Sequence, residues 1–387
     1  MAVSDRHSPV GGGRRLDLWV GAALFLGVLL LFGGRAAARY RPLSYLVGDC
    51  PYYASTAVSL LYDGDLDLRN QLRGGLEVHG RQIALGRDGA WYPKHPVLMP
   101  LAAVPFLHVF GMPGLLVFNL LVLGLLAVVM MRLARPAAGA VPAAAASLLL
   151  LLGTFLRRYD YNFSPDLFAT LILAAGLLAL ARGHDGGGGL LLGLAAAAKL
   201  THLFLVPVGW AFSLWSRGRR GLVRCAAGTA GPIIALACLN WTLFGSPFTT
   251  PYDRNVAIGG YGIVTLSHRG LFDQNPLAGL VAEMIDPLHG LLPTSPVLFL
   301  VLPGFVLLLR RRPAEAVLHL VIGEFLLLLF GTYRYWATSH YGNRFLMPVV
   351  AVAAPSVALT LEWLTRRLRP GRRPCGEPNP PHAGTAP

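Results

Sequence analysis

Charged side chains are scarce in this chain. Asp, Glu, Lys and Arg together make up 13% of its 387 residues, and lysine occurs only at Lys94 and Lys199. In soluble domains, charged side chains make up about a quarter of the residues. Because apolar residues reach 54% and the mean hydropathy is +0.54, the composition excludes an ordinary soluble protein and predicts a membrane protein.

Cysteine and acidic residues are also few. Four cysteines lie in four different environments, so their spacing gives neither a disulfide framework nor a thiolate metal cluster. Nineteen acidic residues face 33 basic ones, for a net charge of +14. The basic residues gather in short loops between apolar segments, which is typical of membrane topology rather than of nucleic-acid binding. We therefore expect no nucleic acid partner.

What the chain has in abundance is apolar runs long enough to cross a bilayer, which takes about 20 residues in a helix. We predict an all-α polytopic membrane protein of about ten transmembrane helices. The predicted spans are 17–34, 113–131, 137–156, 164–181, 186–200, 201–216, 221–244, 292–309, 314–332 and 346–365. Residues 186–216 fit two short helices that meet at the polar residues Lys199, Thr201 and His202 better than one long helix.

Ten crossings place both termini on one side of the membrane. The short basic loops and the basic tail at 366–373 fall on that side, so the positive-inside rule predicts cytoplasmic termini. Arg35, Arg39 and Arg41, directly after the first span, go against the rule. The predicted location is the cytoplasmic (inner) membrane, with membrane lipids as partners.

The predicted organisation is a single transmembrane domain at 17–366. The flanking segments 1–16 and 367–387 are rich in Gly, Pro and Arg, and we expect them to be disordered cytoplasmic tails. The elaborate segments all lie on the other side of the membrane. The active site is therefore expected to face outward.

The first outer loop, residues 35–112, is too long and too polar to be only a connector. Apolar residues recur at helical spacing in 53–62, which predicts an interfacial helix. A small hairpin is expected at 74–92 from its glycines and short β-prone pieces. Residues 97–110 are apolar but too short to span, and they predict a second interfacial helix.

Asp49 opens this loop and Lys94 lies near its end. A carboxylate there accepts a proton from an incoming hydroxyl if it lies within hydrogen-bond reach. Lys94 lies between Pro93 and the dipeptide His95-Pro96 in an extended segment, and its ammonium suits a phosphate headgroup. The competing interpretation is that Asp49 caps the following helix and that Lys94 only anchors the loop to lipid headgroups.

Further polar clusters are predicted on the same side. Asp160 lies in a turn with two arginines, and Asp166 follows as a possible N-cap residue. Lys199 lies at a polar helix apex, where an ionisable group is a functional candidate by default. Arg334 and Arg344 precede the last span, and arginine makes bidentate contacts with phosphate. Glu324, within a predicted span, is either a hydrogen-bonding group inside the bundle or part of a polar pathway.

A set of short motifs occurs in order over roughly residues 45–350. They are Gly48-Asp49 with Tyr52-Tyr53, Asp63 to Leu68, Trp91 to Pro96, Phe244 to Phe248, Asp286 to Pro296, and His340 to Pro348. Together they resemble the GT-C superfamily of integral-membrane glycosyltransferases, which includes the protein O-mannosyltransferases, the lipid A aminoarabinose transferase and the bacterial family 39-like proteins. Cys50 and His95 depart from the pattern, since many relatives have an acidic residue and a proline there.

The resemblance implies a multi-pass transferase that takes a hexosyl or pentosyl group from a polyprenyl-phosphate sugar donor. The acceptor would be a hydroxyl of a glycan, lipid or protein, and the transfer would proceed with inversion. Asp49 would act as general base, and Lys94, with Arg344, would bind the departing lipid phosphate. The other predicted substrate-binding residues are His95, Tyr52, Tyr53, Arg334, Asp160 and Lys199.

No cofactor or metal is predicted. Asp63, Asp65 and Asp67 form a carboxylate cluster that either binds a divalent cation or forms an ordinary turn. Two other functions stay open from the sequence. One is a polytopic transporter or lipid flippase, with charged residues along a central pathway. The other is a catalytically inactive relative with the same fold.

Overall fold

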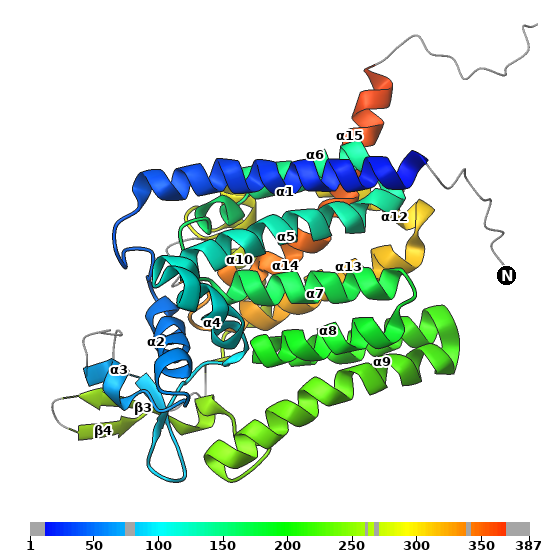
Figure 1. Ribbon diagram of the computed structural model, residues 1–387. Helices are drawn as coiled ribbons and strands as arrows, with labels where there is room; N and C mark the ends of the chain where they lie inside the picture. Colours follow the sequence, from blue (N-terminus) through cyan, green and yellow to red (C-terminus); the bar gives the residue numbers. More distant parts are fainter. Residues whose placement is uncertain (1–11, 74–81, 260–261, 267–270, 338–341, 369–387) are drawn as a thin grey trace, which may run out of the picture.

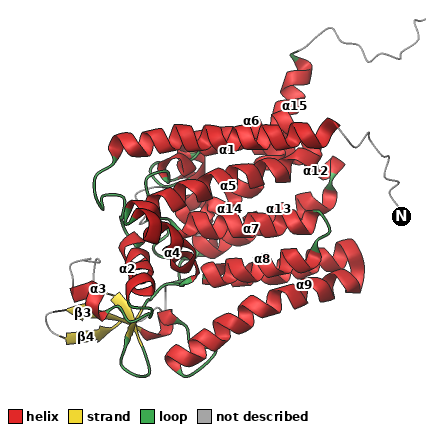
Figure 2. Ribbon diagram, viewed as in Figure 1, coloured by secondary structure: helices red, strands yellow, loops and turns green. Residues whose placement is uncertain are grey.

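The computed structural model describes residues 12–73, 82–259, 262–266, 271–337 and 342–368. Most of the two predicted tails, and His340 and Tyr341 of the last motif, lie outside these residues. The first helix begins at Gly12, ahead of the predicted start of the first span at residue 17. The described chain is mainly helical, as predicted (Figure 2).

Helices of different lengths lie side by side in a bundle (Figure 1). They are α1 (Gly12–Arg39), α5 (Pro113–Ala138), α6 (Ala140–Gly153), α7 (Pro165–Ala181), α8 (Asp185–Ala198), α9 (Val206–Phe244), α12 (Val301–Arg311), α13 (Pro313–Gly331), α14 (Met347–Val352) and α15 (Ala354–Arg367). Helix α5 is the centre of the packing and contacts α1, α6, α7 and α15. Its fully buried leucines, such as Leu115 and Leu123, form the middle of the apolar core.

Four of the described helical segments are long and apolar enough to cross a membrane. They are Arg15–Arg39, Pro113–Ala138, Leu200–Phe244 and Pro313–Gly331. Arg344–Val352 and Ala354–Arg367 meet at a bend of 47° and make a fifth if they count as one span. Helices α6, α7 and α8 are apolar but shorter. The helical, multi-pass fold class is confirmed, whereas the number of ten spans stays a prediction.

The helical region after residue 185 is broken where its sequence is polar. Helix α8 ends at Ala198, and Lys199 has an extended backbone (φ −152°, ψ 111°) before the short 3₁₀ helix η3 (Leu200–Leu205). Helix α9 is interrupted at Gly218, whose φ of +67° favours glycine. The predicted break at the polar apex is therefore confirmed.

The first loop folds against one end of the bundle. It contains α2 (Cys50–Tyr62), α3 (Arg69–Arg73) and α4 (Leu98–Phe110), so the helices predicted at 53–62 and 97–110 are confirmed. Strands β1 (Gln82–Leu85) and β2 (Trp91–Tyr92) pair antiparallel, which confirms the described part of the hairpin. Residues 74–81 lie outside the described chain.

The hairpin belongs to a larger sheet that the sequence did not predict. Strands β3 (Asn255–Gly259) and β4 (Gly262–Thr265) come from the loop after α9, and the strand order is β2-β1-β3-β4. Ile83 pairs with Val256 across the antiparallel β1–β3 contact. The sheet therefore ties two loops, distant in sequence, beside α2 and α3 (Figures 1 and 2).

Short helical elements connect the long helices and strands. They are η2 (Phe155–Arg158), η4 (Pro251–Arg254), α10 (Pro276–Ile285), α11 (Leu291–Thr294), η5 (Pro296–Leu300) and η6 (Arg344–Leu346). Helix α10 packs so closely on α13 that a Cβ atom at Gly279 would lie 1.7 Å from the carbonyl oxygen of Gly331. Only glycine fits at position 279. This contact fixes α10 beside the segment that precedes α14.

Candidate active site

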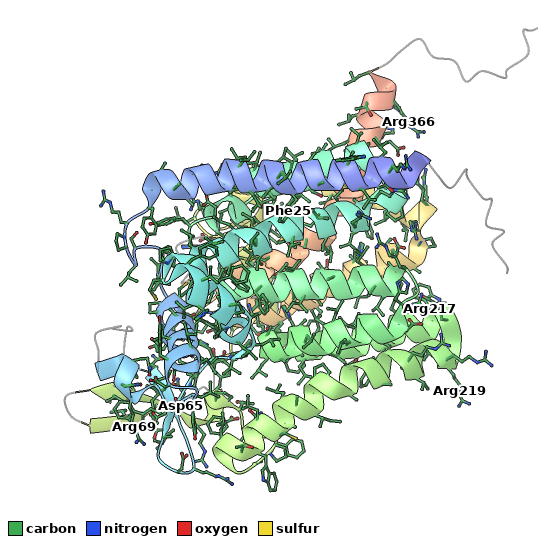
Figure 3. The ribbon with its side chains drawn as sticks, viewed as in Figure 1. Phe25, Asp65, Arg69, Arg217, Arg219 and Arg366 are labelled. Atoms are coloured by element: carbon green, nitrogen blue, oxygen red, sulfur yellow. The ribbon has the colours of Figure 1, made fainter. Side chains whose placement is uncertain are left out.

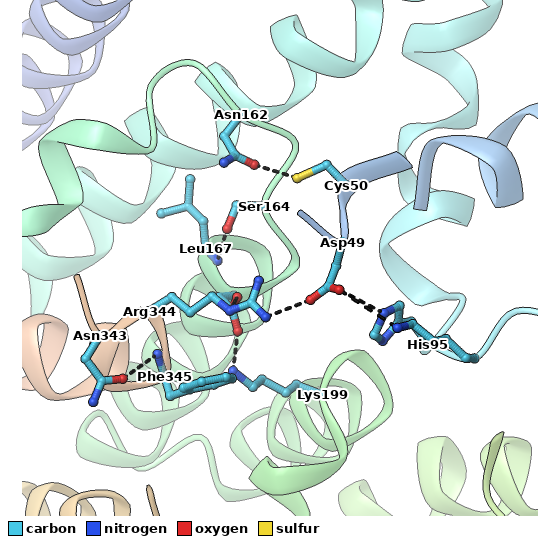
Figure 4. Close-up of polar contacts among 12 residues, drawn as sticks. Asp49, Cys50, His95, Asn162, Ser164, Leu167, Lys199, Asn343, Arg344 and Phe345 are labelled. Atoms are coloured by element: carbon cyan, nitrogen blue, oxygen red, sulfur yellow. Dashed lines mark hydrogen bonds and ion pairs between the residues drawn. The ribbon is translucent and has the colours of Figure 1, made fainter. Parts of the chain in front are cut away.

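Asp49 stands immediately before α2, at the N-cap position, but its side chain makes no capping hydrogen bond. Its carboxylate instead faces three basic side chains from other parts of the chain, of which Figure 4 labels Arg344 and His95. Arg344 Nη2 donates a 2.7 Å hydrogen bond to Asp49 Oδ2. His95 Nε2 lies 3.6 Å and Lys94 Nζ 4.0 Å from Oδ1. Capping therefore does not explain the presence of Asp49.

Lys94 is held by the hairpin and by α2. Its Nζ donates a 2.6 Å hydrogen bond to Oε1 of Gln82 on β1, and it lies 4.4 Å from the centre of the Tyr52 ring. The backbone N–H of Gln82 in turn donates to Tyr52 Oη at 3.1 Å. Strand pairing therefore sets the direction in which the ammonium points.

His95 is packed among aromatic rings. It stacks on Tyr53, with ring centres 5.0 Å apart and planes at 11°, and meets Tyr52 edge to face. Its Nδ1 lies 3.2 Å from the hydroxyl of Tyr252 in η4. Tyr252 comes from the loop after α9, and sequence reasoning did not single it out, because nothing local marks it as a neighbour of His95.

A second carboxylate, Asp166, extends the cluster. Arg344 Nε lies 3.6 Å from Asp166 Oδ2, and Lys199 Nζ pairs with Asp166 Oδ1. The cap of α7 is Ser164, whose Oγ accepts from the N–H of Leu167 at 3.3 Å. The suggestion that Asp166 is an N-cap was therefore wrong. The break in the helix at Lys199 lets that side chain reach Asp166.

Electrostatics keep Asp49 ionised. Burial alone would raise the pKa of its carboxyl, but His95, Arg344 and Lys94 together hold that pKa well below its usual range. Burial lowers the pKa of Lys94 and of His95, and the Asp49 charge opposes both shifts. The neutral form of His95 is therefore favoured at neutral pH, next to a charged carboxylate.

The formal charges of the cluster leave an excess of positive charge. Lys94, Lys199 and Arg344 face the two carboxylates Asp49 and Asp166. All five side chains are at least partly shielded from water, so their interactions are stronger than at an open surface. Such a site attracts an anion, and an arriving phosphate competes with the carboxylates for the same cations.

Three candidate residues lie apart from this cluster. Arg334 is exposed and pairs with Asp273. Asp160 is fully buried and pairs with Arg39 at 2.7 Å and Arg35 at 3.3 Å. Glu324 is exposed on α13, so it is not a group inside the bundle. The predicted convergence of outer-side clusters therefore holds for Lys199 and Arg344 but not for Asp160 and Arg334.

The three aspartates of the first loop bind neighbouring protein groups. Asp63 accepts from the side chain of Asn70, and Asp65 accepts from Ser59 and from the N–H of Asp67. Among the described residues, no three His, Cys, Asp or Glu side chains come together as a metal site. The geometry of this loop is that of a hydrogen-bonded turn.

An apolar cavity of about 170 Å³ lies next to the cluster. Its walls are α4, α8 and α9 together with the Pro93–Val97 segment, and His95 and Asn240 are polar side chains at its edge. Leu98, Leu194, Leu236 and Leu243 are among the apolar side chains that line it. A ligand with a charged head and an apolar chain matches this pairing of polar cluster and apolar cavity.

Comparison with known proteins finds solved structures with a similar fold. No family model and no curated protein sequence matches the chain. The structure of ArnT from Cupriavidus metallidurans bound to undecaprenyl phosphate superposes with a TM-score of 0.57 at 15% identity. That match covers 93% of this chain and 62% of ArnT. The apo ArnT structure gives 0.55 at 16% identity, covering 92% and 61%. The chain thus has an ArnT-like fold and spans less than two thirds of that protein's length.

Proposed function

We propose that this protein is a membrane glycosyltransferase of the GT-C kind. It moves a sugar from a polyprenyl-phosphate donor to an acceptor hydroxyl, at the outer face of the cytoplasmic membrane and with inversion. The observation that carries the proposal is the Asp49 carboxylate, which faces Lys94, His95 and Arg344 beside an apolar cavity. The ArnT-like fold supports it, because one ArnT structure holds undecaprenyl phosphate.

In this proposal, the donor phosphate binds between Lys94 and Arg344, and the first part of its prenyl chain enters the cavity beside His95. Lys94 is already directed by Gln82, and Arg344 is held by Asp49 and Asp166. Two cations fixed in position stabilise the negative charge that grows on the phosphate as the sugar leaves. Tyr52 and Tyr53 are buried against Lys94 and His95 and hold these two side chains in place at the site.

The chemical step is a single displacement. The acceptor oxygen forms a bond to the anomeric carbon while the bond from that carbon to the phosphate oxygen breaks. The hydroxyl proton goes to Asp49, and the bonding electron pair leaves with the phosphate. Because one displacement inverts the anomeric centre, no second carboxylate is needed as a nucleophile.

Donor binding would also improve Asp49 as a base. In the ligand-free protein, the cations hold the pKa of Asp49 well below its usual range, which makes it a weak proton acceptor. A bound phosphate shares Lys94 and Arg344, so less positive charge remains for Asp49. Its pKa then rises toward the range in which a carboxylate accepts a proton. The site thus couples arrival of the donor to activation of the acceptor.

The test is sugar transfer by purified protein in nanodiscs, with a panel of radiolabelled polyprenyl-phosphate sugars and, in parallel, donor hydrolysis without acceptor. Label that appears on an acceptor, or free sugar released slowly, supports the proposal. A transporter would move a labelled lipid across sealed vesicles and leave the sugar–phosphate bond intact. No cleavage of any donor in the panel would count against a transferase.

A further inference from the structure

Five arginines gather on one surface at the end of the bundle that carries α2. Arg35 and Arg39 end α1, Arg41 follows it, and Arg157 and Arg158 lie in η2. We call these five residues the arginine patch. Arg35 Nη2 lies 3.4 Å from the carbonyl oxygen of Arg157, and the N–H of Arg41 donates to Tyr161 Oη at 2.9 Å. Two segments about 120 residues apart therefore form one surface.

Only part of this positive charge is neutralised. Asp160 pairs with Arg35 and Arg39, and its carboxylate is fully buried beneath them. Among the described residues, Arg41, Arg157 and Arg158 form no ion pair, and all three are exposed. The guanidinium-bearing side chains of Arg35 and Arg39 are themselves 39% and 47% exposed. Five positive charges thus face one paired negative charge.

The patch lies where an apolar helix surface ends. Leu26, Leu30 and Leu31 on the preceding turns of α1 are 56%, 77% and 43% exposed. Helix α1 is long and apolar enough to cross a membrane, so its exposed leucines are expected to face lipid. Arg35 and Arg39, one and two turns beyond Leu31, therefore lie at the depth of lipid headgroups. This position makes a lipid headgroup, rather than a soluble ion, the natural partner.

We propose that the arginine patch binds the phosphate of an anionic membrane lipid. Guanidinium groups match phosphate oxygens in a bidentate manner, and several of them in one place hold a headgroup better than a single charge does. The proposal accounts for Arg35, Arg39 and Arg41 on the side of the membrane where the positive-inside rule disfavours them. It does not depend on the proposed transfer reaction.

The bound lipid would lie close to the candidate active site. Asn162, in the same turn as Asp160 and Tyr161, accepts a hydrogen bond from Cys50 Sγ at 2.8 Å. Cys50 directly follows Asp49, and the 157–164 turn therefore contacts both the patch and the start of α2. A headgroup on the patch would steady the turn that supports Asp49.

The test compares two triple variants with equal changes of charge. Arg41→Gln, Arg157→Gln and Arg158→Gln together remove the three unpaired charges of the patch and leave the Asp160 ion pairs intact. The control is Arg219→Gln, Arg220→Gln and Arg224→Gln, all exposed residues of α9. Figure 3 shows Arg219 at the end of the bundle opposite the first loop.

The probe is short-chain dihexanoylphosphatidylglycerol, titrated into the protein in neutral detergent and followed by calorimetry and by Tm. Each arginine near a lipid surface contributes about fivefold in affinity, so the patch variant should bind at least about tenfold more weakly than wild type. The control variant should bind like wild type. Dihexanoylphosphatidylcholine should have little effect on any of the three proteins, and inorganic phosphate, which the candidate active site also attracts, should bind equally to all three.

Equal binding by the patch variant and wild type would overturn the proposal, as would an equal loss in both triple variants. If the patch variant lost inorganic phosphate binding to the same extent as it lost the anionic lipid, the assignment to a lipid would be overturned. Loss confined to the patch variant, at unchanged Tm without lipid, would establish the site.

Discussion

Arg344 Nη2 donates a 2.7 Å hydrogen bond to Asp49 Oδ2 and so joins two residues that lie 295 positions apart. Asp49 lies immediately before α2, and Arg344 begins η6 just before α14. The same guanidinium also approaches Asp166 at the start of α7. This one guanidinium therefore joins three distant segments, and its position depends on the packing of the whole bundle.

Arg344→Gln should weaken binding of a polyprenyl phosphate and destabilise the site. The substitution removes a charged hydrogen bond worth about 1.5–3 kcal/mol. It also leaves the carboxylates of Asp49 and Asp166 with less positive charge beside them. Binding of undecaprenyl phosphate should fall roughly 10- to 100-fold. Arg334→Gln is the matched control, because Arg334 is exposed and pairs with Asp273, away from the cluster around Asp49. Equal losses in both variants would contradict the role given to Arg344.

Lys94→Gln should reduce donor affinity while the fold is retained. The glutamine keeps a polar group near Gln82 but removes the charge that faces Asp49 at 4.0 Å. A charged hydrogen bond to phosphate is about twice as strong as a neutral one, so undecaprenyl phosphate should bind about tenfold more weakly. Arg87→Gln removes the same charge from the exposed turn of the hairpin and should bind like wild type. Unchanged affinity in the Lys94 variant would exclude it from the phosphate site.

Glu283 should make stability depend on pH through its bond to the segment that holds Arg344. Its side chain is fully buried on α10, and its Oε1 accepts a 2.8 Å hydrogen bond from Asn343, next to Arg344. Burial raises the pKa of Glu283 from 4.5 to about 8, although the Asn343 hydrogen bond opposes the shift. The folded protein therefore keeps a proton that the unfolded chain has already lost. The bound proton adds to the free energy of unfolding. This contribution is complete below about pH 4.5 and is lost as the pH rises to about 8.

Glu283→Gln keeps the hydrogen bond and cannot ionise, so its Tm should fall less than that of wild type between pH 5 and pH 9. The difference corresponds to a few kcal/mol, since each pKa unit is worth about 1.4 kcal/mol. Glu283→Ala loses the hydrogen bond and should have the lowest Tm at acidic pH. Parallel Tm curves for wild type and Glu283→Gln would show that Glu283 does not titrate in this range.

Local sequence signals identified part of this architecture. The apolar runs, the two short helices of the first loop and the break at Lys199 follow from composition and helical spacing, which are properties of neighbouring residues. Asp49 and Lys94 were recognised as candidates because charged groups are rare in this chain. The structure brings them within 4.0 Å of each other, while their roles stay proposals.

The missed features all depend on contacts between distant segments. Strand β3 pairs with β1 from another loop, and nothing in residues 255–259 alone predicts that partner. Asp166 was interpreted as a helix cap, because a Ser-Pro-Asp sequence offers two capping residues, and the structure uses Ser164. Asp160 was grouped with the substrate-binding residues, but two arginines of α1 reach it instead. The sequence therefore identifies charged residues that are unusual in an apolar chain, whereas the packing of distant segments determines their ion-pair partners.

Asp49 is the centre of the proposed mechanism, and its replacement by asparagine tests that mechanism most directly. The measurement is sugar transfer, with donor hydrolysis in parallel, by wild type and Asp49→Asn in nanodiscs, alongside undecaprenyl phosphate binding and Tm. We predict that Asp49→Asn stays folded, with a lower Tm because its ion pairs are lost, and retains donor binding, but transfers about 10²- to 10⁴-fold more slowly, because the acceptor loses its general base. Transfer at the wild-type rate by a folded, donor-binding Asp49→Asn protein would contradict the account.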